Sequence, residues 1–168
     1  MSIIVAHLAD YPTHLSTVAG WIYHQWGQRP GNTAEATAER LRSHTTRNGI
    51  PFMLLALDGS ACVGCACLRA TDLPGRDDIG PWLASVYVPE DRRGEGIGAK
   101  LVRAIETAAV RLGYPELYLF TPDRQRFYAH LGWMPVEQFL RDGAPVTVMR
   151  TALRAGLAGT PPLGRGRI

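Results

Sequence analysis

The spacing of apolar side chains changes several times along the chain, and each change predicts a new element. Residues 3–8 are a short apolar run that is typical of a strand. Over residues 13–26 apolar side chains recur every three or four positions, as on the buried face of a helix. Residues 33–44 repeat that spacing after a break at Pro30-Gly31, and Asn48-Gly49 ends this second helix. The beginning of the chain therefore predicts one strand followed by two helices.

The rest of the chain alternates strand and helix signals around one long central helix. We expect strands over 52–57 and 61–68 with a turn at Asp58-Gly59, a loop over 72–81, a strand over 82–88, a helix from 96 or 97 to 112, a strand over 117–120, a helical segment over 124–131, and strands over 134–139 and 145–151. Hairpins on both sides of a strand–helix–strand crossover predict a mixed α/β (α+β) fold. A dinucleotide-binding fold is excluded, because the glycine-rich turn follows a middle strand.

Composition and charge narrow the class of protein. The 168 residues suffice for one domain, expected over residues 1–155, followed by a Gly- and Pro-rich tail over 156–168 that is expected to be flexible. The net charge of +3 suits an anionic ligand, but the absence of a dense Lys/Arg block argues against nucleic acid. We recognise no leader and no apolar run of membrane length, so we expect a cytoplasmic protein without a membrane partner.

Three cysteines lie close together in the strand expected over 61–68. Cys62, Cys65 and Cys67 allow a metal site or a disulfide, or they are small apolar residues of a buried strand. On a regular strand Cys65 and Cys67 face one side and Cys62 the other. No histidine stands nearby to complete a ligand set, so we expect free thiols and no metal.

A glycine-spaced turn joins the strand over 82–88 to the central helix. Its residues are Arg93, Gly94, Glu95, Gly96, Ile97, Gly98 and Ala99, in the pattern Arg-x-x-Gly-x-Gly. The backbone N–H groups that open a helix have no partner within it, and the helix dipole adds positive potential there. Glycine lets a ligand approach that backbone closely. The turn therefore predicts a site for phosphate, with Arg92 and Arg93 able to supply further charge.

A second motif follows about thirty residues later, and together the two resemble one family. The residues are Phe127, Tyr128, Ala129, His130, Leu131, Gly132 and Trp133. With the glycine turn they resemble the GNAT superfamily of acetyl-CoA-dependent N-acetyltransferases. The match is close from about Trp82 to Val136, and the element order extends it to about residue 152. The resemblance implies an acyl-CoA N-acyltransferase fold, with a mostly antiparallel central sheet, a splayed pair of strands and flanking helices.

The resemblance also implies where the donor, acetyl-CoA, is bound. The strand residues Val86, Tyr87 and Val88 would pair with the pantetheine arm as an added strand does. Residues 93–99 would hold the pyrophosphate. Thr121 stands where many relatives have an asparagine that contacts the cofactor, and its hydroxyl can still form a hydrogen bond.

Catalytic roles follow by the same resemblance. The backbone N–H of Val86 or Tyr87 would polarise the thioester carbonyl, and Tyr128 would protonate the departing thiolate. Many relatives carry a glutamate on the strand over 82–87, and this chain has none. The alternatives for the general base are a water held by Ser85 or by a backbone carbonyl, and a neutral histidine at His24 or His130.

The sequence leaves the acceptor open. A primary amine is expected, on a small molecule or at a peptide or protein N-terminus. Substrate-binding candidates are His24, Trp26 and Trp82, but the tryptophans equally fit packing against the sheet. Carboxylates at Asp72, Asp77 and Asp78 either attract a cationic acceptor or form a solvated cluster.

Relatives commonly dimerise, so a homodimer is a further expectation. Two other classes of protein remain open beside the enzyme: a sensor that binds acyl-CoA without catalysis, and a structural domain with a vestigial site.

Overall fold

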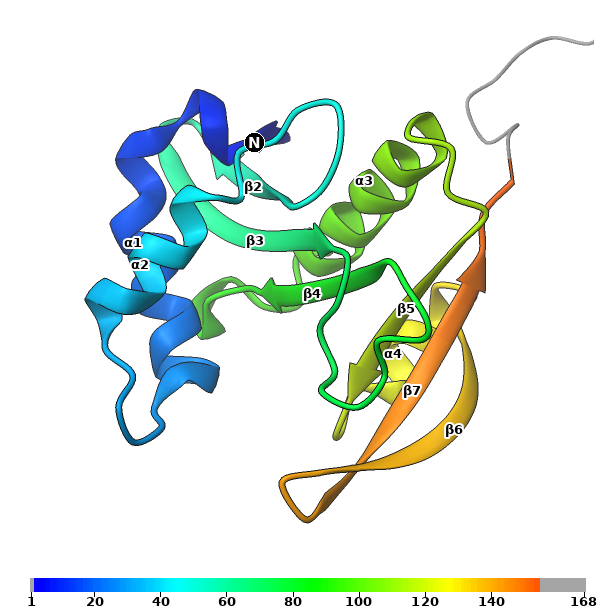
Figure 1. Cartoon of the computed structure of the whole chain (residues 1–168). Coiled ribbons are helices and arrows are strands. Elements are labelled where there is room, and N and C mark those ends of the chain that lie inside the picture. The colour runs from blue at the N-terminus through cyan, green and yellow to red at the C-terminus, as the bar shows by residue number, and fades with distance from the viewer. Residues whose placement is uncertain (1, 155–168) are drawn as a thin grey trace, which may run out of the picture.

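The computed structural model describes residues 2–154 and is built around one seven-stranded sheet (Figure 1). The strands are β1 (Ile3–His7), β2 (Phe52–Asp58), β3 (Ala61–Arg69), β4 (Trp82–Tyr87), β5 (Glu116–Thr121), β6 (Met134–Arg141) and β7 (Ala144–Ala152). Their order in the sheet is β1-β2-β3-β4-β5-β7-β6, and β4 with β5 is the parallel pair in an otherwise antiparallel sheet. The mixed α/β fold with a mostly antiparallel sheet is therefore confirmed.

Helices cover both faces of the sheet. One face carries α1 (Leu15–Ile22) and α2 (Ala34–Arg42), and the other carries α3 (Ile97–Arg111) and the short α4 (Gln125–His130). Leu101, Val102 and Ile105 of α3 are fully buried against the strands on their side. A separate buried cluster lies under α1 and α2. No helix among residues 2–154 is both long and apolar enough to span a bilayer.

The loop between β3 and β4 takes the place of a helix over the far half of the α1/α2 face. Its Leu73 is 1% exposed and packs with Trp82 of β4 and with Val146 and Val148 of β7. Trp82 and Ala84 are two residues apart on one strand, so this third cluster continues the face that α1 and α2 cover. The loop therefore borders β4 on the face of the sheet that α1 and α2 cover.

The elements predicted from periodicity are confirmed, with their ends shifted by one or two residues. Short additions were not predicted: 3-10 turns at Leu8–Asp10, Pro12–His14 and Glu90–Arg92, and a π-helical turn at Tyr23–Gly27 that extends α1. Such π-turns cost hydrogen-bond geometry and are frequent at functional sites. The tail expected from residue 156 lies outside the described residues.

The predicted orientation of Cys62 is wrong. A bulge between β2 and β3 pairs Ala56 with Gly64 but Leu57 with Cys62, which inserts one extra residue into β3. This reverses the alternation of side chains, so Cys62 packs on the same face as Cys65 and Cys67. All three thiols are free, and burial raises the pKa of each one. Among residues 2–154 no three potential ligand side chains come together as a metal would require.

Candidate active site

The sheet opens between its two parallel strands. β4 and β5 are paired only at Trp82 and Tyr118, and beyond this pair the strands diverge (Figure 1). A second bulge, in β4, contributes to this, because Cys67 faces Ala84 whereas Cys65 faces Tyr87. Ser85 takes the left-handed conformation there, with φ of 54°. The strand is thereby redirected, and on the side of β5 its backbone from Ser85 onward has no paired strand.

The glycine turn lies at the end of β4 and opens α3. Gly94 and Gly96 both have positive φ, at 84° and 79°, and a Cβ on either would meet no atom within 4 Å. Glycine at these two positions therefore permits the left-handed backbone conformation and leaves the surface of the turn uncovered. Gly96 is the N-cap of α3 and receives no side-chain cap, so the first N–H groups of the helix remain available to a ligand. This arrangement suits phosphate.

The two arginines before the turn are already engaged by the protein. Arg92 donates to Glu95 at 2.8 and 2.9 Å and to Asp58, at the end of β2, at 3.0 Å. These hydrogen bonds raise the pKa of Arg92 and lower the pKa of Glu95. Arg93 Nε donates to the Val88 carbonyl at 3.0 Å. Arg92 therefore neutralises the one carboxylate of the turn and ties the turn to the β2–β3 hairpin.

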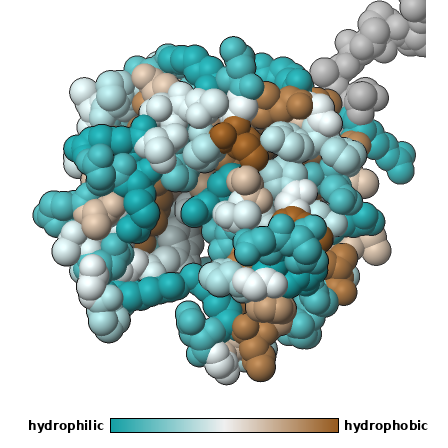
Figure 2. Space-filling view, viewed as in Figure 1, coloured by the Kyte–Doolittle hydropathy of each residue, from teal (hydrophilic) through white to brown (hydrophobic). Residues whose placement is uncertain are grey.

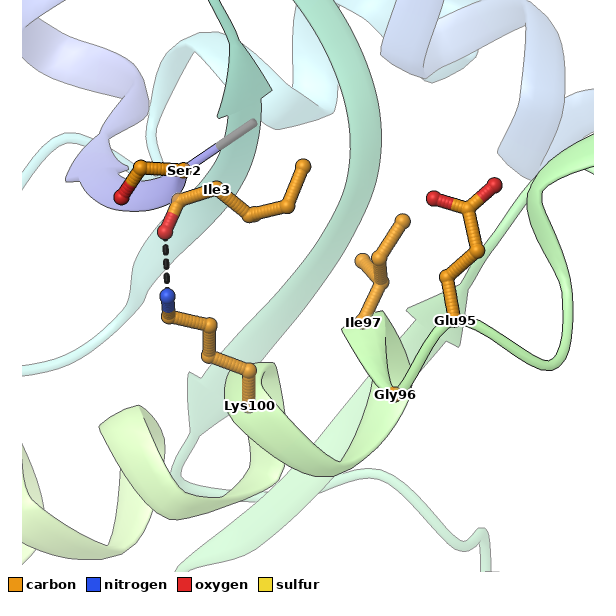
Figure 3. Close-up of a pocket in the computed structure, with 6 residues that line it drawn as sticks. All are labelled: Ser2, Ile3, Glu95, Gly96, Ile97 and Lys100. Carbon is orange, nitrogen blue, oxygen red and sulfur yellow. Dashed lines mark hydrogen bonds between the residues drawn. The ribbon is translucent and has the colours of Figure 1, made fainter.

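A pocket of ≈ 280 Å³ adjoins the same turn on the side of β1. Its lining residues are Ser2, Ile3, Glu95, Gly96, Ile97 and Lys100. Figure 3 shows Glu95 and Ile97 pointing into one space while the Lys100 ammonium donates to the Ile3 carbonyl. The lysine thus joins the start of α3 to the first strand and helps to fix the turn.

The motif around Tyr128 docks directly on the glycine turn. A Cβ at Gly98 would stand 3.3 Å from the Phe127 ring and 3.9 Å from Val88. Gly98 is therefore small because α4 approaches it closely, as well as being near the predicted phosphate site. Tyr128 itself is 9% exposed and belongs to the buried cluster against which Val86 and Val88 pack. The fold thus brings together the two motifs that lie thirty residues apart in sequence.

The Tyr128 side chain is held by its ring and leaves its hydroxyl without a hydrogen bond to any described residue. Its ring centroid lies 4.9 Å from Phe127 and 6.2 Å from Trp133, both edge-on. Trp133 is fixed in turn, because its indole N–H donates to the buried Glu106 carboxylate at 2.9 Å. Burial raises the pKa of Tyr128 to about 12. The group is therefore a neutral proton donor at physiological pH.

Two of the proposed site residues have structural contacts that the sequence did not reveal. Thr121 is 4% exposed, and its hydroxyl oxygen accepts the backbone N–H groups of Asp123 and Arg124, which starts α4. The Ser85 carbonyl accepts a hydrogen bond from the Cys65 thiol at 3.5 Å. Ser85 lies at the opening of the sheet, whereas Thr121 is buried beneath α4 and has little surface to offer a cofactor.

The two tryptophans proposed for acceptor binding differ in their exposure. Trp82 is 0% exposed, and its indole N–H donates to the Ile79 carbonyl at 2.9 Å. Since no surface of it remains, Trp82 is removed from the acceptor candidates. Trp26, on the π-turn, is 40% exposed, and its ring stands edge-on to Tyr87 at 6.2 Å. Trp21 packs on the same tyrosine at 5.3 Å.

A recess lies on the α1/α2 face. Figure 2 shows the molecule hollowed between the side formed by α1 and α2 and the side formed by the β3–β4 loop and the β6–β7 hairpin, with a mostly hydrophilic rim. Arg29, after the π-turn, and Asp142, at the tip of the hairpin, lie 3.9 Å apart and join the two sides. The exposed His24 belongs to the same π-turn as Trp26.

An open pair of parallel strands, a turn suited to phosphate and a buried tyrosine are the features that an acyl-CoA-dependent acyltransferase requires. The chain matches the Acetyltransferase (GNAT) family over residues 17–133 and belongs to that family. Acetyl-CoA-dependent acetylation is therefore the activity of its class, as the resemblance of the two motifs implied.

Known proteins of the family resemble the chain in sequence and in fold. Mouse N-alpha-acetyltransferase 80 is 29% identical over 131 residues, which are 73% of this chain but 38% of that protein. An aminoglycoside 6'-N-acetyltransferase solved with coenzyme A has a TM-score of 0.73 at 17% identity and covers 95% of this chain and 99% of its own. The structure of yncA from Salmonella typhimurium with acetyl-CoA has a TM-score of 0.71 at 14% identity, covering 94% of this chain and 98% of its own.

Proposed function

We propose that this protein transfers the acetyl group of acetyl-CoA to a primary amine, which attacks the thioester directly in a ternary complex. The observation that carries the proposal is the docking of α4 on the glycine turn, which sets Tyr128 beside the free edge of β4. Pantetheine lies along Ser85–Val88 in the opening, and the pyrophosphate binds the N–H groups of residues 94–99. No cysteine belongs to either motif, so no acyl-enzyme is required.

The strand stabilises the transition state. As the amine nitrogen bonds to the carbonyl carbon, negative charge develops on the carbonyl oxygen, and the N–H of Val86 or Tyr87 donates to it. The bulge in β4 and the left-handed conformation of Ser85 change the direction of the strand just before these N–H groups. Collapse of the intermediate then breaks the C–S bond and releases the thiolate of coenzyme A.

Tyr128 stabilises that leaving thiolate. With a pKa of about 12 against a thiol of about 8.5 in water, full proton transfer would be uphill by roughly 5 kcal/mol. Burial in the same apolar cluster raises the pKa of a bound thiol too, which narrows the difference. Tyr128 therefore acts first as a hydrogen-bond donor to developing sulfur charge and completes the transfer as the bond breaks.

Thiol release tests the proposal directly. Acetyl-CoA is offered with a polyamine, an aminoglycoside and a peptide with a free N-terminus, since the aminoglycoside enzyme and N-alpha-acetyltransferase 80 point to different acceptors. We expect amine-dependent release with at least one class. Tyr128→Phe should lower kcat by about 100-fold, because one general acid contributes on that order, with acetyl-CoA affinity changed less than about twofold.

Two results would contradict the proposal in different ways. Tight acetyl-CoA binding without thiol release for any amine would favour an acyl-CoA sensor. Failure to bind coenzyme A at all would indicate a structural domain whose site is vestigial. Unchanged turnover in Tyr128→Phe would leave the reaction standing and remove Tyr128 from it.

A further inference from the structure

A partly buried carboxylate stands on the acceptor side of the open strands. Asp72 follows β3 in the loop toward β4, its side chain is 17% exposed, and it lies 3.4 Å from the Arg69 guanidinium. The next residue, Leu73, is buried against Trp82 of β4. This contact holds the start of the loop on the α1/α2 face of the sheet, beside the recess visible in Figure 2.

The ion pair with Arg69 places Asp72 at the end of β3, because Arg69 faces Trp82 of β4 across the β3–β4 pair. On one side is Cys67, which faces Ala84 of β4. Burial, and after it the charge of the Asp72 carboxylate, raise the pKa of Cys67 to about 12. On the other side is Arg141, whose guanidinium lies 4.9 Å over the Phe120 ring of β5. Both Arg69 and Arg141 act on the Asp72 carboxylate.

Other carboxylates near the opening are engaged elsewhere. Glu95 and Asp58 are bound by Arg92. Glu106 accepts from Trp133 behind the sheet, on the α3 face. Glu116, at the beginning of β5, pairs with Arg150. Asp72 differs from these groups in its place, because the neighbouring Leu73 packs on Trp82 of β4 on the α1/α2 face, where the recess lies.

We propose that Asp72 is the general base of the acetyl transfer, taking a proton from the acceptor ammonium directly or through one bridging water. The inference rests on the proposed function and supplies the group that β4 lacks. Burial raises the pKa of Asp72 from its ordinary value, against the lowering effect of Arg69 and Arg141. A carboxylate with a raised pKa is a stronger base, and the neighbouring cations favour its ionised form.

The protons balance over one turnover. Asp72 takes one proton from the ammonium and later gives it to solvent, which leaves a neutral amine to form the C–N bond. When the C–S bond breaks, Tyr128 gives its proton to the thiolate. The second proton lost by nitrogen restores Tyr128, and the third remains on the amide. One proton is released for each acetyl group transferred.

Asp72→Asn keeps the size of the side chain and removes the base. With the acceptor found in the amine panel, we expect kcat to fall by about 100-fold and the acetyl-CoA Kd to change less than about twofold. The remaining rate should rise tenfold per pH unit between pH 6 and 8, because only the free amine then reacts. Asp10→Asn is the matched control, an exposed aspartate paired with Arg47 outside this loop, and should behave as wild type.

Chemical rescue separates catalysis from loop packing. In Asp72→Ala, added formate should raise kcat at least about tenfold over the same variant without formate. A purely structural aspartate would not show this effect. The variant also remains informative if its thermal midpoint falls, since rescue is measured within one protein. Wild-type turnover combined with full activity in Asp72→Asn, or no rescue in Asp72→Ala, would overturn this inference alone. Absence of wild-type turnover would instead overturn the proposed function.

Discussion

Single residues in this protein owe their roles to neighbours that are distant in sequence. Glu106 is buried on α3, and its carboxylate accepts from the Trp133 indole at 2.9 Å and from Arg103 at 2.8 Å. The Trp133 ring is one wall of the Tyr128 site. One buried carboxylate thus orients an aromatic side chain that in turn positions the proposed acid. This is a positioning role, since Glu106 lies behind the sheet.

Replacing Glu106 tests that role. Glu106→Leu leaves the buried Trp133 N–H without an acceptor, so the free energy of unfolding should fall by about 1–3 kcal/mol, measured with urea. Glu106→Gln retains an acceptor oxygen and should lose less than half as much. If the tryptophan positions Tyr128, kcat should follow the same order while the KM for acetyl-CoA stays constant. Equal stability of the leucine and glutamine variants would contradict the hydrogen bond.

Elements, rather than residues, form the proposed cofactor site. The site consists of the end of one strand, the turn that follows and the beginning of a helix, and each part is fixed by another element. Arg92 ties the turn to β2, Lys100 ties the helix to β1, and Phe127 of α4 covers Gly98. The first helical N–H groups are consequently held in place before a ligand arrives, which lowers the entropic cost of binding it.

Gly96→Ala should disturb the turn without a steric clash. The φ of 79° costs about 1–2 kcal/mol for a residue with a Cβ, although no atom lies within 4 Å of that Cβ. Relaxation of φ would turn the helical N–H groups away, so the Kd for acetyl-CoA should rise about tenfold, by calorimetry.

Gly20→Ala is the control for that change. It lies in α1, a Cβ there also meets nothing within 4 Å, and its φ is not positive. We expect a stabilisation of about 0.4–1 kcal/mol and an unchanged Kd. A similar loss of affinity in both variants would show that glycine conformation does not shape the site.

At the scale of the whole molecule, the described residues are built on one continuous sheet that opens at one place, between β4 and β5. Six neighbouring strand pairs join the seven strands, but the β4–β5 pair is a single contact, and buried clusters on both faces hold the two halves together. Some titratable side chains are buried as well, which shifts their pKa. His44, between α2 and β2, is 7% exposed, and burial lowers its pKa. Burial likewise lowers the pKa of His7 in β1.

Stability should therefore decline in weak acid. Because the folded pKa of His44 lies below the unfolded value of about 6.5, the unfolded chain binds the proton first as the pH falls. The stabilisation that neutral His44 contributes to the folded state is therefore fully present above about pH 6.5 and is lost as the pH falls below that value. We expect urea unfolding to show a lower free energy at pH 5 than at pH 7, and His44→Gln to reduce that difference. His130→Gln, at an exposed site on α4, should not; an equal effect of both would contradict this assignment.

Sequence periodicity determined the elements and their order, because apolar spacing depends on neighbours only a few residues away. The glycine turn and the Tyr128 motif were recognisable for the same reason, since each is a continuous segment. From these the family could be inferred, and the match over residues 17–133 confirmed it.

Tertiary structure decided the rest, because register and contact depend on residues far apart in the chain. The bulge opposite Ala56 moved Cys62 to the other face, and burial under the loop removed Trp82 from the acceptor site. Contacts also decided that Arg92 binds carboxylates, and that Asp72, one of several acidic loop residues in the sequence, is partly buried beside Arg69. A local pattern cannot specify such pairings, since the loop closures that create them span tens of residues.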